Sequence, residues 1–262
     1  YLEILEEQKI EPNFWCSEEY FQKAGLHEQS FIDEIFEVVD DGWWVVPPLS
    51  LEGKFLWRNS FKILKEFKGI WSDFVDLIEY PTMKPQFLDY EFIFDPKTFL
   101  DMEGGQWQVF RKNVRKFPAR FGKGNLVYDW ISNYPGRDLY EPIEDLIANW
   151  AQDLDSIEDD EPMLKYLFHG QNRKGLWTLP KRRLLGVNVW DENWKYINFR
   201  YCLCAQEDFL SEYMRYLFYT DQFILGKEKL VNDGGTLGRE SLKKFKEKMC
   251  PVRVRNVNSW LL

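Results

Sequence analysis

The final third of the chain carries the pattern that restricts the fold most. Its two apolar stretches, LLGVNVW and KYINFRYCLC, meet near Glu192-Asn193 and predict a β-hairpin. An amphipathic segment over residues 207–219 predicts a helix, and residues 229–232 predict a short strand. A helix capped by Thr236 or a neighbour follows, and residues 252–260 form a last strand. The order hairpin, helix, strand, helix, strand predicts an α/β fold.

The middle of the chain adds strands and a strongly basic helix. FLDYEFIFD, at residues 87–95, predicts a strand by composition, and NLVYDWI predicts another. Between them, Asp95-Pro96 begins a short helix that Gly104-Gly105 ends. The next helix carries one apolar stripe at steps of three and four that faces a core: Trp107, Phe110, Val114 and Phe117. EPIEDLIANWAQDL predicts a further amphipathic helix.

The first 82 residues predict a separate α+β lobe. SEEYFQKAG is a short helix with Ser17 as its N-cap and Gly25 as its terminator. FIDEIFEVVDDGWWVV predicts a hairpin that turns at Asp41-Gly42 and that Pro47-Pro48 ends. Helices are expected near residues 60–67 and 72–79, and prolines at 81 and 85 mark a linker. We therefore predict two units, residues 1–82 and 83–262.

Composition excludes several classes of protein. Of 262 residues, 45% are hydrophobic and 18% aromatic, which indicates a globular chain with a thick aromatic core. No apolar run approaches the ~20 residues of a membrane helix, and no leader is visible, so we expect a cytoplasmic protein. The four cysteines form no CxxC pair, and His27 and His169 adjoin helix-ending or loop glycines. We therefore expect no metal site, no tightly bound cofactor and no histidine-based nucleophile.

The charge is strongly negative overall but unevenly distributed. A net charge of −9 argues against coating a polyanion with the whole surface. Three segments are nevertheless basic, namely residues 111–123, 173–183 and 239–255. Three basic segments in an acidic chain predict one converging anion site.

Two stretches resemble a known family. FIFDPKTFLDMEGGQWQVFRKNVRKF resembles the segment of phosphatidylglycerol lysyltransferase C-terminal domains where an aromatic strand leads to a glycine and a basic Arg-Asn helix. VNDGGTLGRESLKKFKEKMCP is similar to the closing segment of that family, where Leu-Gly opens a helix with a basic pair. The resemblance spans roughly residues 87–262 and implies the GNAT acetyltransferase fold, a mixed sheet flanked by helices. In that fold a central strand splays from its neighbour around an acyl donor. These enzymes and the related Fem-like transferases pair two GNAT-like lobes and use aminoacyl-tRNA, which implies a degenerate first lobe as one interpretation of residues 1–82.

One departure from the superfamily concerns the donor. Acetyl-CoA-binding members have a glycine-rich junction after the central strand, whose N–H groups hold the pyrophosphate. Here the junction CAQEDFLSEY has no glycine and places Glu207 and Asp208 at the helix start, where they repel a diphosphate. The sequence thus argues against ordinary acetyl-CoA binding and leaves aminoacyl-tRNA or a CoA-like thioester as donor.

Three carboxylates are candidates for removing a proton from an attacking ammonium. Asp233 is the first choice because it follows a strand and precedes Gly234-Gly235. Asp89 and Glu91, on one face of the predicted strand over residues 87–95, are the second choices. The alternatives are an Asx turn at Asp233 and an exposed edge-strand face for the other two.

Six cations are candidates for clamping the phosphates of a donor or a tRNA end: Arg111, Lys112, Arg115, Lys181, Arg182 and Lys243. The alternative for each is a solvated surface, and Lys244 and Lys246 have the same two interpretations. Trp177 could stack on a base or belong to the core.

The resulting prediction is an acyltransferase or aminoacyltransferase that uses a phosphate-bearing donor and an amine or hydroxyl acceptor. The acceptor attacks directly, without a covalent enzyme intermediate. Two alternatives stay open: a nucleic-acid-modifying acyltransferase whose basic segments hold the acceptor strand, and an inactive GNAT-like module that binds a nucleic acid or a protein.

Overall fold

The computed structural model describes most of the chain. The described residues are 2–12, 14, 16–23, 29–32, 35–40, 43–50, 66–71, 86–122, 124–133, 140–151, 172–179 and 183–261. Predicted features at Gly25, His27 and His169, and the predicted helix over residues 72–79, lie outside these ranges.

The described strands form one mixed sheet, and their order is β1-β2-β3-β4-β11-β5-β10-β9-β8-β7-β6. Their bounds are β1 Gln29–Ile32, β2 Ile35–Asp40, β3 Trp43–Ser50, β4 Glu66–Trp71, β5 Gln86–Phe94, β6 Leu126–Trp130, β7 Arg173–Thr178, β8 Leu184–Glu192, β9 Tyr196–Cys204, β10 Leu230–Asn232 and β11 Arg253–Leu261. Within this sheet β9 pairs parallel with β10, and β3 pairs parallel with β4. The predicted hairpin in the final third is confirmed as β8 and β9, which pair antiparallel.

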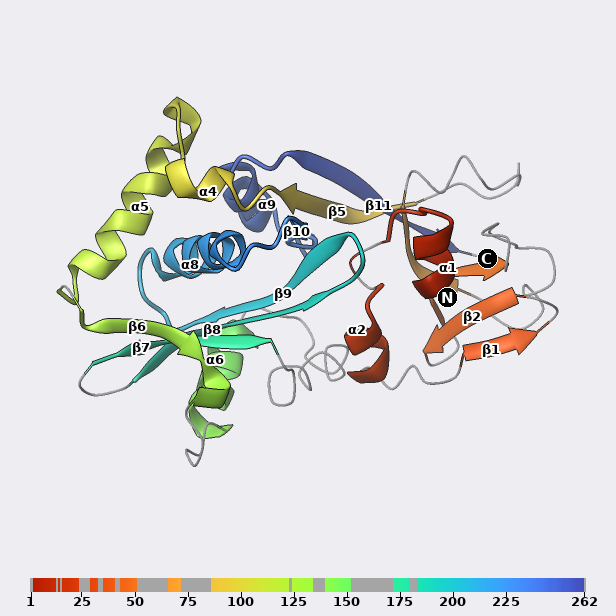
Figure 1. Cartoon of the computed structure of the whole chain (residues 1–262), viewed down its shortest axis with the longest axis horizontal. Coiled ribbons are helices and arrows are strands. Elements are labelled where there is room, and N and C mark those ends of the chain that lie inside the picture. The colour runs from red at the N-terminus through yellow and green to blue at the C-terminus, as the bar shows by residue number, and fades with distance from the viewer. Residues whose placement is uncertain are drawn as a thin grey trace.

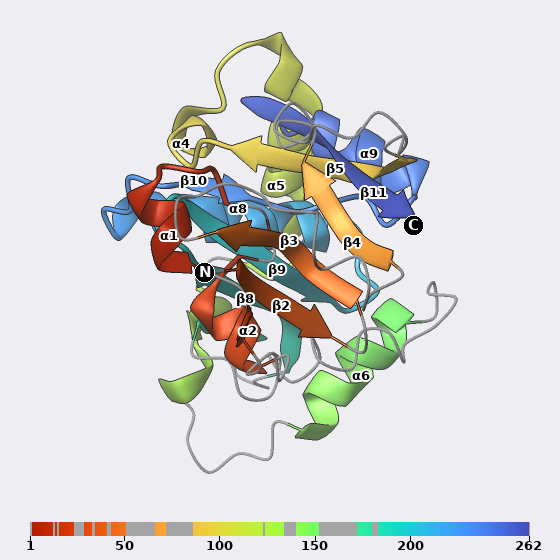
Figure 2. The same cartoon turned by 90° about the vertical axis from the view of Figure 1, so that its right-hand side faces the viewer.

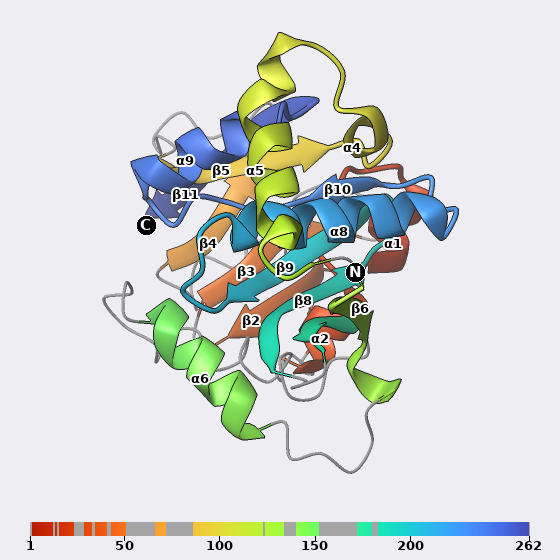
Figure 3. The same ribbon diagram turned by 90° about the vertical axis from the view of Figure 1, so that its left-hand side faces the viewer.

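Helices flank this sheet. Their bounds are α1 Leu2–Glu7, α2 Glu18–Lys23, α4 Thr98–Asp101, α5 Gln108–Ala119, α6 Tyr140–Ala151, α8 Leu210–Ile224 and α9 Glu240–Glu247, with short 3-10 turns η2 Gly105–Trp107 and η3 Ile131–Asn133. In Figure 1, α8 lies above β9 and α6 lies below β8. Figure 3 shows α5 and α8 together in front of the sheet. The predicted α/β class, a mixed sheet flanked by helices, is confirmed.

The core lies between the helices and the sheet and is rich in aromatic rings. Phe99 stacks on Tyr219 at 4.0 Å between ring centroids, and Phe199 stacks on Phe218 at 4.1 Å. The stripe predicted on the basic helix is confirmed, because all four of its members on η2 and α5 are buried: Trp107, Phe110, Val114 and Phe117. Trp177 is buried as well, so its core interpretation is the correct one.

Several local predictions are wrong. Strand β3 continues through Pro47-Pro48 to Ser50, because shifts in its register with β2 accommodate the prolines. Residues 66 and 67, placed in a helix, belong to β4, while residues 60–65 lie outside the described ranges. Thr236 does not cap α9, which begins after Arg239 without a side-chain cap; Thr236 instead donates to Asp89.

The predicted boundary near residue 82 falls between described segments. Strand β4 pairs antiparallel with β11, and Figure 2 shows β4 beside β11, with β3 and β2 further from it. One sheet therefore connects strands from both predicted units, and the division into two lobes stays a prediction.

Candidate active site

A cleft opens where β9 and β10 part. The two strands pair only between Tyr196–Asn198 and Leu230–Asn232, yet β9 continues to Cys204. After β10 the chain follows β5 instead, because Asp233 N donates to Phe92 O at 2.9 Å and Phe92 N donates to Gly234 O at 3.2 Å. The divergence leaves a cavity of ≈480 Å³, which we call the β9–β10 cleft.

The walls of the β9–β10 cleft combine aromatic and ionic side chains. Its aromatic lining residues come from several elements: Phe14, Trp150, Phe199, Tyr201 and Phe245. Its charged lining residues are Asp89, Arg200, Arg215, Asp233, Arg239 and Lys246. An apolar cavity with a few convergent charged groups is the usual form of a small-molecule site.

The turn after β10 forms one edge of the cleft and depends on its glycines. Gly234 has φ +61°, in the left-handed region that side chains disfavour. A Cβ on Gly235 would lie 2.2 Å from Asp89 Oδ2. Asp89 approaches this closely because it accepts hydrogen bonds from Thr236 N at 2.6 Å and Leu237 N at 2.8 Å. The Asp-Gly-Gly sequence is therefore required by a close contact between β5 and the turn.

A buried cluster of one carboxylate and two cations forms the charged wall of the cleft. Asp233 Oδ2 accepts from Arg215 Nε at 3.1 Å and from Tyr219 Oη at 2.8 Å. Lys246 Nζ lies 3.1 Å from Asp233 Oδ1 and donates to the carbonyls of Asp233 and Gly235. The side chains of Arg215, Asp233 and Lys246 are only 9%, 3% and 3% exposed. The cluster holds two cations for one anion.

The pKa shifts in this cluster follow from burial and ion pairing. Burial alone raises the pKa of Asp233, but the charges of Arg215 and Lys246 outweigh it, and the pKa is lowered. Burial lowers the pKa of Lys246 despite its partner Asp233. For Arg215 burial also acts to lower the pKa, but the charge of Asp233, together with contributions from Cys202 and Tyr219, outweighs it and the pKa is raised, so Arg215 stays a cation.

Arg200 reaches the cleft through a β-bulge. Trp190 pairs with Phe199 and Val189 with Tyr201, so Arg200 has no partner of its own on β8. Its Nε donates to Asp191 Oδ2 at 2.6 Å, and its Nη2 donates to Ser17 Oγ at 3.1 Å. Both charged side chains are fully buried, so Asp191 neutralises Arg200 within the core.

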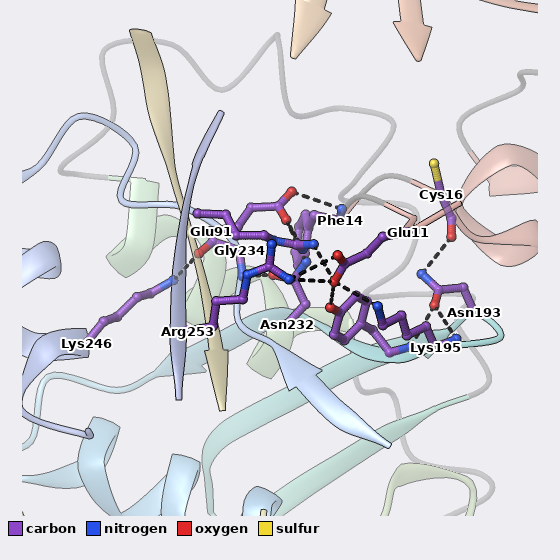
Figure 4. Close-up of polar contacts among 12 residues, drawn as sticks. Glu11, Phe14, Cys16, Glu91, Asn193, Lys195, Asn232, Gly234, Lys246 and Arg253 are labelled. Atoms are coloured by element: carbon purple, nitrogen blue, oxygen red, sulfur yellow. Dashed lines mark hydrogen bonds and ion pairs between the residues drawn. The ribbon is translucent and has the colours of Figure 1, made fainter. Parts of the chain in front are cut away.

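The N-terminal segment closes the neighbouring side of the site. Phe14 lines the cleft, and its backbone N–H donates to Glu91 Oε1 at 3.0 Å. Figure 4 shows Glu11 beside Lys195 and Arg253, and Glu11 Oε2 lies 3.0 Å from Arg253 Nη1. The N-terminal residues are thus attached to β9, β5 and β11 by polar contacts.

The three predicted carboxylates all lie at or beside the site, but each already accepts several hydrogen bonds. Asp233 is held by Arg215, Tyr219 and Lys246, and Asp89 by the backbone after the glycine turn. Glu91 is buried and accepts from Phe14 N, from Asn232 Nδ2 at 2.9 Å and from Arg255 Nη2 at 2.6 Å. Neither Asp89 nor Glu91 lies on an edge strand, because β10 and β11 pair with β5 on its two sides. These contacts suit carboxylates that position neighbouring groups, and proton abstraction by any of them stays a prediction.

Of the six cations predicted to clamp phosphates, none that the structure describes lines the cleft. Arg111 donates to the carbonyl of Met102, and Lys112 and Arg115 are exposed on α5; no described residue of α5 lines the cleft. Lys243 lies on α9 with its ammonium 4.5 Å from the centre of the Tyr90 ring, also outside the cleft lining. Lys181 and Arg182 lie outside the described residues. Of the three basic segments, residues 239–255 alone supply described cations to the cleft lining, Arg239 and Lys246.

The acidic start of α8 is neutralised by two other predicted basic segments. Arg120 Nη2 lies 3.0 Å from Asp208 Oδ2, and Arg183 Nη1 lies 3.7 Å from Glu207 Oε1. The basic helix α5 therefore ends beside the acids at the start of α8. The position that would hold a pyrophosphate in an acetyl-CoA-binding enzyme of the fold that the sequence resembles carries ion pairs here.

Arg200 and Arg215 are the cleft cations that the sequence pattern did not reveal. Arg215 has a weak signal, since it lies inside an otherwise amphipathic helix next to the buried residue Met214. Arg200 has no signal in the sequence, because its position depends on a bulge between two strands whose sequences predict regular pairing.

No protein-family model matches the chain, and no curated protein sequence matches it. Solved structures do. A conserved protein of unknown function from Bacteroides thetaiotaomicron shares 16% identity at a TM-score of 0.68, over 89% of this chain and 84% of that one. The C-terminal domain (DUF2156) of an Agrobacterium fabrum protein assigned as a lysylphosphatidylglycerol synthetase shares 13% identity at a TM-score of 0.60, over 87% of this chain and 80% of that one. L-PGS from Bacillus licheniformis shares 13% identity at a TM-score of 0.61, over 87% of this chain and 80% of that one.

The chain has the fold of lysylphosphatidylglycerol synthetase C-terminal domains. This confirms the resemblance seen at residues 87–262, and the match extends over more of the chain than those residues. The β9–β10 cleft lies in this synthetase-like fold at the splayed strands that the resemblance implied. Among the described helices, none has the length and apolar character needed to cross a bilayer.

Proposed function

We propose that the protein is an aminoacyl- or acyltransferase that holds the anionic part of a phosphate-bearing donor in the β9–β10 cleft. The observation that carries this proposal is the buried cluster of Arg215, Asp233 and Lys246 in the cleft wall. With all three groups ionised, the cluster has one positive charge in excess. Buried charge is costly unless it is compensated, so the cluster favours a ligand that brings a negative charge. A phosphodiester or phosphate oxygen suits the guanidinium of Arg215.

Two features favour aminoacyl-tRNA over acetyl-CoA as donor. The start of α8, where a diphosphate would bind, is acidic and engaged with Arg120 and Arg183. The solved structures with this fold include a domain assigned to a lysylphosphatidylglycerol synthetase, a name that pairs an aminoacyl group, lysyl, with an acceptor, phosphatidylglycerol. The aminoacyl donor and an amine or hydroxyl acceptor are therefore the proposed substrates, and a cytoplasmic site of action belongs to the same proposal.

The chemistry proposed for this cleft is direct attack of the acceptor on the donor carbonyl. Holding both reactants in one cavity supplies most of the advantage, since well-oriented neighbours gain ~7–11 kcal/mol of the barrier. Arg215 lies where it can stabilise negative charge that develops on the donor. Asp233 keeps Arg215 in place through two contacts, with the Nε bond at 3.1 Å.

The test measures transfer and donor binding with variants inside and outside the cleft. Purified protein is incubated with radiolabelled aminoacyl-tRNAs or CoA thioesters and a panel of amines and alcohols. Arg215→Met should lower donor affinity at least ~10-fold, because it removes a charge-assisted contact. Arg239→Gln, at a half-buried position in the same wall, should lower it less.

Lys112→Gln is the matched control, since Lys112 is exposed on α5 outside the cleft. It should leave donor affinity unchanged. An equal loss in Lys112→Gln and Arg215→Met would place the donor site on α5 and remove the support for the cleft. A steep loss of binding with added salt distinguishes a polynucleotide donor or acceptor strand from a small CoA-like donor.

A binding module without catalysis is the second candidate. The observation that favours it is the full engagement of Asp89, Glu91 and Asp233 in contacts with neighbouring groups. An anion that binds in the cleft with no transfer to any acceptor, in wild-type protein, would support this candidate. Transfer that Arg215→Met reduces would exclude it.

A further inference from the structure

Two thiols stand on the β9 wall of the cleft. Cys202 lines the cavity and lies beyond Asn198, the last residue of β9 that pairs with β10. Cys204 follows on the same face, and its Sγ lies 3.7 Å from Cys202 Sγ. The cavity lining includes Cys202 but not Cys204. Cys202 is thus the thiol that a ligand would meet, and Cys204 is the one behind it.

Helix α8 supplies this part of the wall with one cation, Arg215, and a hydroxyl group, Ser211. Arg215, a cleft residue, donates from Nη1 to Ser211 Oγ at 3.0 Å, and Ser211 also lines the cleft. Each thiol acts electrostatically on the other. The other titratable and charged groups that act on them are Arg215, Glu212 and Tyr219 on α8, Asp233 after β10 and Tyr128 on β6. A cleft-facing sulfur beside a cation and hydroxyl and thiol donors is the environment of a reactive cysteine.

The direction of the pKa shifts agrees with this geometry. The hydrogen bond from Cys204 lowers the pKa of the Cys202 thiol; burial opposes this, and Arg215 lowers the pKa further. The same hydrogen bond and burial raise the pKa of Cys204, which favours the protonated form of that thiol. By contrast, burial raises the pKa of Cys250, and Cys16 is buried away from the cleft lining.

We propose that Cys202 is a covalent acceptor of acyl groups within the β9–β10 cleft, in a reaction separate from the direct attack of an amine or hydroxyl acceptor on the donor. The Cys202 thiolate attacks the carbonyl carbon of an activated ester, and a sulfur–carbon bond forms. The bond from that carbon to the leaving oxygen breaks, and the oxygen departs with the electron pair as an alkoxide or phenolate. The product is an S-acyl cysteine. The natural donor rests on the proposed function, but the reactivity of the thiol does not.

The experiment uses the whole chain and 4-nitrophenyl acetate, an activated ester that needs no specific donor site. Released 4-nitrophenolate is followed by absorbance, and the acetylated cysteine is located by peptide mass spectrometry. We expect S-acetylation of Cys202 at least ~5-fold faster near neutral pH than that of Cys250, in line with its greater thiolate fraction. Equal or faster acetylation of Cys250 or Cys16 in the folded protein would overturn the proposal.

Variants separate a reactive thiol from a merely accessible one. Cys202→Ser should abolish the S-acetyl product at this position, and Cys250→Ser should leave the rate unchanged. Cys204→Ala should move the midpoint of the pH–rate profile upward, because it removes the hydrogen bond that stabilises the Cys202 thiolate. An unchanged midpoint in a Cys204→Ala protein with wild-type circular dichroism would count against the thiol pair.

The proposed function fails by a different result. Absence of transfer from any aminoacyl-tRNA or CoA thioester, with Cys202 still acetylated by the nitrophenyl ester, contradicts the transferase and leaves the reactive thiol. Transfer that Arg215→Met reduces, with no acetyl group on Cys202, contradicts the reactive thiol alone.

Discussion

At the scale of single residues, the cleft is built by side chains that hold other groups in position. Asp89 binds the backbone after the glycine turn, and Asp233 holds Arg215 and Lys246. Lys246, on α9, in turn donates to the carbonyl of Gly235 at 2.6 Å. Each of these contacts joins segments that are distant in the sequence, so one substitution alters the cleft edge and the strands beside it.

Gly235→Ala tests this directly. The added methyl group would meet Asp89 Oδ2 at 2.2 Å, so the turn or the carboxylate must move. We expect the free energy of unfolding to fall by about 1–3 kcal/mol, as for overpacked sites, together with weaker anion binding in the cleft. Gly105→Ala is the control, because nothing lies within 4 Å of the position that its added methyl group would take. Denaturant unfolding of both variants checks the difference, and equal stabilities would contradict the close contact.

At the scale of elements, polar contacts attach the N-terminal segment to the strands around the cleft. Glu11 contacts Tyr196 at the start of β9 and Arg253 and Arg255 of β11, while Phe14 N binds Glu91 of β5. Ser17 extends the same pattern, since it caps α2 by accepting from Tyr20 N at 3.1 Å and also accepts from Arg200. The N-terminal segment therefore orders one wall of the cleft.

Glu11→Gln is expected to loosen that wall. The neutral amide loses its ion pairs with Arg253 and Arg255, and the free energy of unfolding should fall by about 1–3 kcal/mol. Limited proteolysis near residue 14 should also become faster. Glu240→Gln removes an ion pair with Lys244 in which both side chains are exposed, so the free energy of unfolding should change little. A Glu11→Gln protein as stable as Glu240→Gln would show that the N-terminal contacts contribute nothing to the fold.

At the scale of the whole molecule, acid should weaken the fold. Burial raises the pKa of Glu11, but its hydrogen bond with Tyr196 and the charge of Arg255 outweigh this and lower it; ion pairs also lower the pKa of Asp233. A carboxylate with a lowered folded-state pKa contributes stability above its unfolded pKa, about 4, and loses it as the pH falls through the folded value.

The free energy of unfolding from urea titrations should therefore be constant near neutral pH and fall as the pH is lowered below about 4. Glu11→Gln should show a shallower fall, because one of the two contributing groups is gone. A free energy that rises on acidification would contradict the assigned ion pairs. The control is a titration in high salt, which should leave the buried Asp233 contribution largely in place.

The sequence by itself determined the types of the elements around the cleft and their order. Hydrophobic periodicity and glycine placement depend on neighbours within a few residues, and they predicted the β8–β9 hairpin, the buried stripe of α5 and the turn at Gly234-Gly235. The tertiary structure alone decided which charges face the cleft. Arg200 lies in the cleft lining because of a bulge in the pairing of β8 with β9, but Asp191 neutralises its charge. Arg215 is held in the cleft wall by its ion pair with Asp233. Charge density along the chain pointed instead to α5, and Arg120, directly after α5, pairs with Asp208 outside the cleft. A run of cations carries no information about which partner will neutralise it.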